Sequence, residues 1–134
     1  MQFLYLFTIT FFIFLTLDLI GIQKVILPIF EKSIGHLMRK NPLLGWAAVF
    51  YIAYILGVTH LVSYPYITGE ISLFDAFINS TIIGLLAYGT YEFTSYSIMK
   101  DWTRKQLIID TVWGGVLTSS SVLVGIFIFE KLSI

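Results

Sequence analysis

Long apolar runs separated by short polar segments dominate the pattern of this chain. A helix that crosses a bilayer needs roughly 20 mostly apolar residues, and four runs meet that length. They cover residues 3–22, 43–63, 73–99 and 107–129. The first run has no basic residue before it and contains Asp18, so we interpret it as a retained span and not as a signal peptide. The pattern predicts an all-α, integral membrane four-helix bundle that forms one domain over residues 1–134.

Residues 28–40 are too polar to span but keep a helical spacing. The apolar residues Ile29, Phe30 and Ile34 are spaced so that they share one face of a helix, and Lys32 lies on the opposite face. Such a pattern is typical of an amphipathic helix at the membrane surface. We therefore predict an interfacial helix that starts near Pro28, between the first and second spans.

Two short polar segments set the start and the pairing of the later helices. Ser72 precedes Asp75 by three residues, which is the spacing of a capping box at the start of the third span. The connection over residues 100–105 is short, so the third and fourth spans should be antiparallel neighbours.

Composition supports a membrane protein and excludes several other classes. Apolar residues make up 57% and charged residues 12%, whereas a soluble domain carries about 25% charged residues. Eight basic residues balance eight acidic ones, so we expect the lipid bilayer as a partner and no nucleic acid. Cysteine is absent, which removes disulfides and thiolate metal sites.

Basic residues are distributed unevenly between the two ends of the predicted bundle. Only Lys131 falls on the side of the termini and the second connection, and basic residues near span ends mark the cytoplasmic side. The pattern predicts that both termini lie outside and that the first and third connections are cytoplasmic. Those connections hold Lys24, Lys32, Arg39, Lys40, Lys100, Arg104 and Lys105.

Three acidic residues lie inside three different spans. A charge at the bilayer centre costs about 2.5–3.5 kcal/mol on the insertion scale, so such residues usually have a partner or a function. In the predicted topology, Asp18, Glu92 and Asp110 all fall in the cytoplasmic half. They form a candidate site for protons or a polar ligand, although a structural role in hydrogen bonding explains them equally well. The remaining candidate residues of this site are Tyr51, Tyr54, Tyr88, Thr90, Tyr91 and Trp113.

Small and polar residues also recur at helical spacing on the third and fourth spans. Small residues allow membrane helices to approach closely, and polar ones bond across the contact. These stripes most simply face one another inside the bundle. The candidate packing residues are Gly84, Gly114, Thr118, Ser121 and Gly125.

Signals for catalysis or a bound cofactor are missing from the sequence. His36 and His60 are far apart and there is no cysteine, so we expect no metal or haem. The serines at 119–121 have no nucleophile elbow, and no glycine-rich phosphate loop is present. We expect no cofactor and name no catalytic residue.

Several runs of the chain together form a recognisable pattern. They are Leu17-Asp18, residues 35–38, residues 50–57 with Tyr64-Pro65, residues 87–95, residues 100–102 and residues 110–114. These runs resemble a family of small bacterial membrane proteins known as domain of unknown function 2177. The resemblance implies a four-helix protein of the bacterial inner membrane and supplies no activity. It draws attention to the acids and tyrosines already named.

Three functions fit these features. The first is a proton-linked transporter or a polar-ligand binder that uses the acidic layer. Four spans are few for a transport pathway, so this version calls for a homodimer. The second is an accessory subunit of a larger membrane complex, and the third, ranked last, is a membrane-embedded lipid enzyme. Polar stripes that point inward favour a site, and stripes that point outward favour a partner protein.

Overall fold

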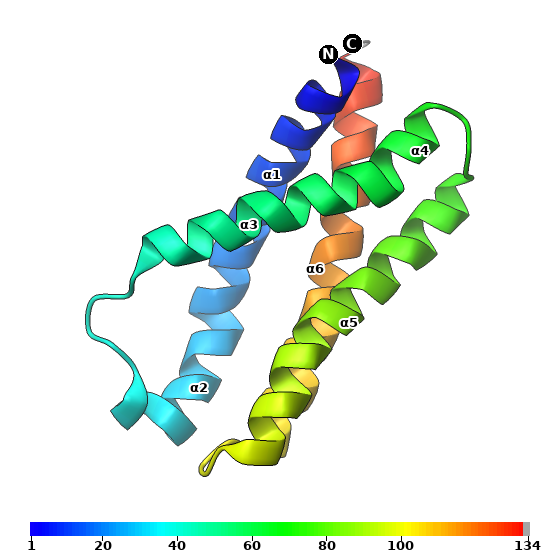
Figure 1. Ribbon diagram of the computed structural model, residues 1–134. Coiled ribbons are helices and arrows are strands. Elements are labelled where there is room, and N and C mark those ends of the chain that lie inside the picture. The colour runs from blue at the N-terminus through cyan, green and yellow to red at the C-terminus, as the bar shows by residue number, and fades with distance from the viewer. Residues whose placement is uncertain (133–134) are drawn as a thin grey trace.

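The computed structural model describes residues 1–132, which form helices packed side by side (Figure 1). No strand occurs in that part of the chain. Four helical runs are long and apolar enough to cross a membrane, namely Gln2–Leu37, Leu44–Ile67, Leu73–Ile98 and Arg104–Lys131. The predicted all-α fold with four candidate spans is therefore confirmed.

The first two runs are each built from several helical segments. The first run comprises α1 (Gln2–Gly21), a π-helical segment (Ile22–Ile26), α2 (Leu27–Ile34) and a short 3-10 turn (Gly35–Leu37). The second run comprises α3 (Leu44–Val58), a π-helical segment (Thr59–Ser63) and α4 (Tyr64–Ile67). The third and fourth runs are the unbroken helices α5 (Leu73–Ile98) and α6 (Arg104–Lys131).

A proline follows each π-helical segment. Pro28 and Pro65 lack an N–H group, and a proline ring inside a helix presses on the carbonyl group four residues earlier. Those carbonyls belong to Lys24 and Leu61, which lie within the two π-helical segments. A wider π turn gives the ring more room, so both runs stay helical past the proline.

The helix boundaries differ from the prediction at both prolines. The predicted interfacial helix over residues 28–40 is not seen as a separate element, because helical backbone continues directly from the first span to Leu37. The second span is also longer than predicted, since Tyr64 and Tyr66 are helical and not part of a loop. The physical reason is the same in both places: the π turn accommodates a residue that would otherwise end the helix.

Capping boxes start the two unbroken helices. Asp75 N donates to Ser72 Oγ (3.0 Å) and Ser72 N donates to Asp75 Oδ2 (3.3 Å), as predicted. Thr103 and Gln106 make the same pair of bonds at α6, at 3.1 and 2.9 Å. The second capping box makes the fourth helix begin at Arg104, earlier than the predicted residue 107.

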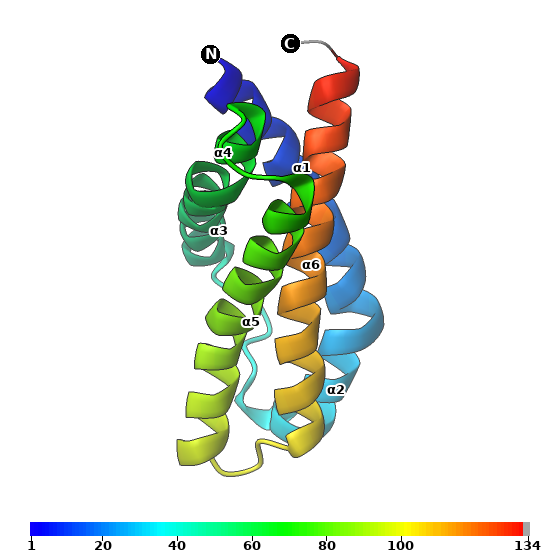
Figure 2. The ribbon, with the colours of Figure 1, turned by 90° about the vertical axis from the view of Figure 1, so that its right-hand side faces the viewer.

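The two ends of the bundle differ in how closely the helices pack. The beginning of α1 and the end of α6 lie at one end, called the terminal end, and the connections after Leu37 and Ile98 lie at the other, called the loop end (Figure 1). Helices α5 and α6 pack as antiparallel neighbours and α1 packs on α6 (Figure 2). Helix α3 crosses this group at a tilt and approaches it closely only toward the terminal end (Figure 1).

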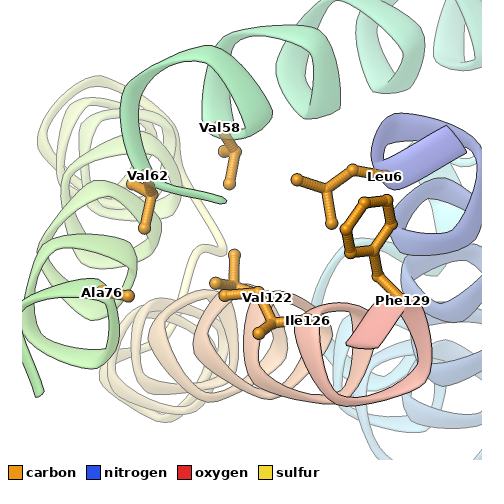
Figure 3. Packing of buried hydrophobic residues seen from close by; sticks show 7 residues of the cluster. All are labelled: Leu6, Val58, Val62, Ala76, Val122, Ile126 and Phe129. Atoms are coloured by element: carbon orange, nitrogen blue, oxygen red, sulfur yellow. The ribbon is translucent and has the colours of Figure 1, made fainter. Parts of the chain in front are cut away.

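A hydrophobic core fills the terminal end. Seven buried side chains from α1, α3, the second π-helical segment, α5 and α6 meet there (Figure 3). The cluster joins all four runs at that end, and packing of this kind holds helices together. The residues are Leu6, Val58, Val62, Ala76, Val122, Ile126 and Phe129.

Glycines allow the closest helix contacts. A Cβ atom at Gly84 of α5 would come within 2.8 Å of both the Gly114 carbonyl carbon and Thr118 Oγ1 on α6. A Cβ atom at Gly125 would collide with Thr10 of α1. Gly84 and Gly125 thus lie at helix–helix contacts where a side chain larger than a hydrogen atom does not fit.

Candidate functional site

The helices separate toward the loop end and leave a cavity of about 720 Å³ between the four runs. Residues 41–50, which lead into and begin α3, are all exposed, and two of them, Ala47 and Phe50, line one side of the cavity. We call this space the acid cavity, since two carboxyl groups line it among mostly apolar neighbours. Seven predicted site residues contribute to its wall: Asp18, Tyr51, Tyr88, Thr90, Tyr91, Asp110 and Trp113.

Asp18 lies on the last full turn of α1 and is almost completely buried. Its carboxylate accepts a hydrogen bond from Trp113 Nε1 (3.4 Å), and the Tyr51 hydroxyl lies close to it. Gly21, less than one turn further along, makes room for the indole ring, because a Cβ atom there would lie 2.6 Å from Trp113 Cε2. Three helices are therefore linked through one buried carboxyl group.

Asp110 and Glu92 form a second buried acidic group. Glu92 Oε1 accepts a hydrogen bond from Trp102 Nε1 at 2.9 Å, and the Asp110 carboxyl lies within hydrogen-bonding reach of Glu92. Glu92 Oε2 is buried and has no N–H or hydroxyl donor beside it. Two ionised carboxylates this close repel each other, whereas one proton held between them would let one group donate to the other.

Glu92 differs from Asp18 and Asp110 in its place relative to the acid cavity. It does not line the cavity but lies behind Asp110, against Trp102. The Trp102 ring packs edge-on against Phe30 and Tyr91, with ring centroids 5.4 and 5.6 Å apart. The buried indole therefore fixes Glu92, and Glu92 in turn positions Asp110.

The tyrosines occupy three different positions. Tyr51 and Tyr88 lie in the wall of the acid cavity, and Tyr88 is packed on Gly114, whose missing side chain makes space for the ring. Tyr54 lies closer to the terminal end, where its hydroxyl is 2.9 Å from Thr118 Oγ1. Tyr91 is 53% exposed at the rim of the cavity. The structure thus gathers most of the predicted tyrosines, but not Tyr54, at one cavity.

Thr90 also lies at the rim. Its hydroxyl donates to the Leu86 carbonyl oxygen at 2.6 Å, within its own helix. Thr90 is exposed, so its side chain faces the surroundings of the bundle as much as the cavity.

The polar stripes of the spans point into the bundle. Thr10 and Asp18 on α1 are buried, and so are Ser80 and Glu92 on α5. On α6, all members of the predicted stripe are buried: Asp110, Gly114, Thr118, Ser121 and Gly125. Inward stripes are the arrangement expected of a protein with an internal polar site.

Two features of this site are not evident from the sequence. The position of Asp110 near the start of the predicted fourth span suggests a helix cap, but Thr103 caps that helix and Asp110 lies nearly two turns inside. The position of Trp102 beside a span end suggests the membrane interface, although Trp102 is buried and binds Glu92. Glu92 lies in α5 and Trp102 lies in the connection that follows α5. Helical periodicity does not continue into a connection, so the sequence does not reveal this contact.

The described part of the chain contains no group of three or more potential metal ligands. The fold and the inward-facing acids define a multi-pass α-helical membrane protein with an internal acidic cavity. The chain belongs to the family described as "Predicted membrane protein (DUF2177)", whose model matches residues 3–127. This confirms the resemblance noted in the sequence. No curated protein and no solved structure is detectably similar to the chain.

Proposed function

We propose that this protein binds an amphiphilic molecule in the acid cavity, with a cationic head group at Asp18 and Asp110. The observation that carries the proposal is the presence of two buried carboxyl groups in an otherwise apolar and aromatic wall. A buried polar group in a membrane span is costly unless it serves a partner. A ligand with a complementary head group provides that partner.

The size and position of the cavity suit such a ligand. Its volume of about 720 Å³ falls in the range of roughly 300–1,000 Å³ that is usual for small-molecule sites. Phe50 of α3 and Tyr91 of α5 line it and are 52% and 53% exposed, so the opening lies between these helices. A molecule dissolved in the bilayer would reach the carboxyl groups from the side.

The charges of the site favour a cation over an anion. No Lys, Arg or His occurs among the described residues that line the acid cavity. In a medium of low dielectric constant a carboxylate attracts a cation strongly. The faces of Tyr51, Tyr88 and Trp113 add cation–π attraction for an ammonium group.

A proton-linked form of this activity would use a proton held between the Asp110 and Glu92 carboxyl groups. A bound ammonium group at Asp110 would take the place of the proton between Asp110 and Glu92, and that proton would leave to water. Binding of the cation would then release one proton. The packed core at the terminal end blocks a straight route through one chain, so transport in this form calls for a homodimer or a change in helix packing.

We also propose an orientation in which the loop end faces the cytoplasm of a bacterial cell and both termini lie outside. The seven basic residues near the loop end support it. A reporter fused after Ile134 should be active only outside the cytoplasm, and one inserted beside Arg39 only inside. The opposite pair of results would reverse the orientation.

The binding proposal is tested by titrating decylamine into the full chain in nanodiscs of zwitterionic lipid, followed by calorimetry. The doubly substituted Asp18→Asn/Asp110→Asn variant should bind at least about tenfold more weakly, because amides carry no charge. Glu130→Gln makes the same chemical change on an exposed residue at the terminal end and should bind normally. Decanol, which has no charge, should bind more weakly than decylamine to the natural chain.

Equal affinity of the doubly substituted variant and the natural chain would reject the proposal. One observation then favours an accessory subunit. Large apolar side chains are exposed at the start of α3, where Trp46 is 76% and Leu44 is 70% exposed. A second membrane protein could pack against them. Purification in mild detergent with a stoichiometric partner chain would support that alternative.

A further inference from the structure

A second cavity, of about 710 Å³, lies at the loop end on another side of the first helical run. Its wall is formed by one side of residues 24–33 and by the connection between α5 and α6. We call it the basic groove, because three lysines line it: Lys24, Lys32 and Lys105. The sequence pattern assigns none of them to a site.

Among the described residues, no carboxylate forms an ion pair with any of the three ammonium groups of the basic groove. Asp101 is the acidic residue in the groove wall, and its carboxylate lies 3.4 Å from His36 Nε2. Three positive side chains therefore face one negative side chain in the wall of the groove. Three like charges around one space repel one another, so an anion bound between them would be stabilised by all three.

The arrangement of these lysines places them around one space. Lys24 and Lys32 are eight residues apart, or about two helical turns, and so lie on one side of their helical run. Lys105 comes from the first turn of α6 on the opposite wall, where helix N–H groups also favour negative charge. Two separate chain segments thus supply the positive charge.

The basic groove also has apolar wall residues, next to the polar Ser33 and Thr103. Val25 and Ile29 lie beside the lysines on the same helical run, and the Trp102 ring forms part of the facing wall. A soluble anion would leave these side chains without a partner, whereas a phospholipid has acyl chains to cover them. Basic pockets beside membrane helices are known to hold anionic lipid head groups.

We propose that the basic groove binds the phosphate head group of an anionic phospholipid, with an acyl chain along Val25 and Ile29. This proposal is independent of the ligand in the acid cavity. Different positions of the same helical run line the two spaces: Ile22, Ile26 and Phe30 face the acid cavity. Opposite charge in the two spaces means that they select different ligands.

Dihexanoyl phosphatidylglycerol added to the purified full chain in neutral detergent tests this site, with bound lipid measured by native mass spectrometry. The Lys24→Gln/Lys32→Gln/Lys105→Gln variant should bind at least about tenfold more weakly, since each lysine near an anionic lipid contributes roughly fivefold. The Arg39→Gln/Lys40→Gln/Lys100→Gln variant removes the same charge at the same end, outside the groove, and should bind normally.

Additional variants and ligands distinguish a specific lipid site from a general effect of charge. Replacing the three groove lysines by arginine retains the charge and should retain binding. Lys32→Gln alone should weaken binding by about fivefold, and this variant replaces the triple glutamine variant if the latter does not fold. Dihexanoyl phosphatidylcholine should bind much more weakly than the anionic lipid. Equal losses in the two triple glutamine variants would overturn the proposal, and so would inorganic phosphate binding as tightly as the lipid.

Discussion

The terminal end and the loop end of this bundle are built from the same four helical runs but differ in packing. At the terminal end, Leu6, Val122 and Phe129 belong to a core that joins all four runs. Away from that core, the start of α3 stands apart from the other helices and leaves the acid cavity open toward α5. The difference indicates that the core at the terminal end packs the helices together, whereas the rest of the bundle contains the buried carboxyl groups.

The same contrast appears in the polar side chains of the two ends. Near the terminal end, Ser80 and Ser121 donate their hydroxyls to carbonyl groups of their own helices, at 2.7 Å each. At the loop end, Asp18 and Glu92 accept from residues of other segments. A serine that donates to its own helix needs no partner on a neighbouring helix, whereas Asp18 and Glu92 join separate chain segments near the acid cavity.

The largest expected effect comes from the contact between α5 and α6. Gly84→Ala should abolish folding or lower the melting temperature more than truncation of a single core side chain does, because its methyl group would collide with the backbone of Gly114. Gly57→Ala is the matched control, since no atom lies within 4 Å of a Cβ atom there. Thermal unfolding in detergent measures both. Similar melting temperatures for the two variants would mean that the helices are not this close.

Truncating a leucine should lower the free energy of unfolding more in the core at the terminal end than at the start of α3. Leu6→Ala removes a fully buried side chain from the core at the terminal end, and such changes cost about 2–5 kcal/mol. Leu44→Ala makes the same change at the start of α3, where the side chain is 70% exposed, and should have little effect. The free energies of unfolding, measured with a denaturing detergent, should follow this order. A larger loss for Leu44→Ala would contradict the proposed contrast.

A smaller effect is expected at the indole that holds Glu92. Trp102→Phe removes the N–H donor and leaves a buried carboxylate oxygen without its partner, which costs about 1–3 kcal/mol. Trp46→Phe is the control, because Trp46 is 76% exposed. The midpoint of thermal unfolding should fall only for Trp102→Phe. If both variants unfold alike, the hydrogen bond to Glu92 does not contribute.

The sequence predicts the parts of this structure that depend on periodicity and on local chemistry. Apolar length predicts the four candidate spans, and Ser72 with Asp75 predicts the start of α5. The spacing of small and polar residues also indicates which side of α6 is buried. These signals are local, so one chain segment is enough to reveal each of them.

The rest depends on how the helices are placed relative to one another. Periodicity does not give the tilt of α3, which opens the acid cavity and leaves Phe50 at its rim. Nor does it indicate that Gly21 makes space for Trp113, since those residues lie on different helices. A proline in a sequence indicates a helix boundary, which is why the sequence does not predict the helical continuation past Pro28 and Pro65.

The measurement that tests the central contrast most directly uses the absence of cysteine in the natural chain. Ala87→Cys and Ala76→Cys place single thiols on the same helix, α5, in the wall of the acid cavity and in the core at the terminal end. In nanodiscs, N-ethylmaleimide should modify only the thiol at position 87, and decylamine should slow that reaction. Both thiols should react in denaturing detergent. Equal modification rates in the folded protein would contradict a bundle that is closed at one end and open at the other.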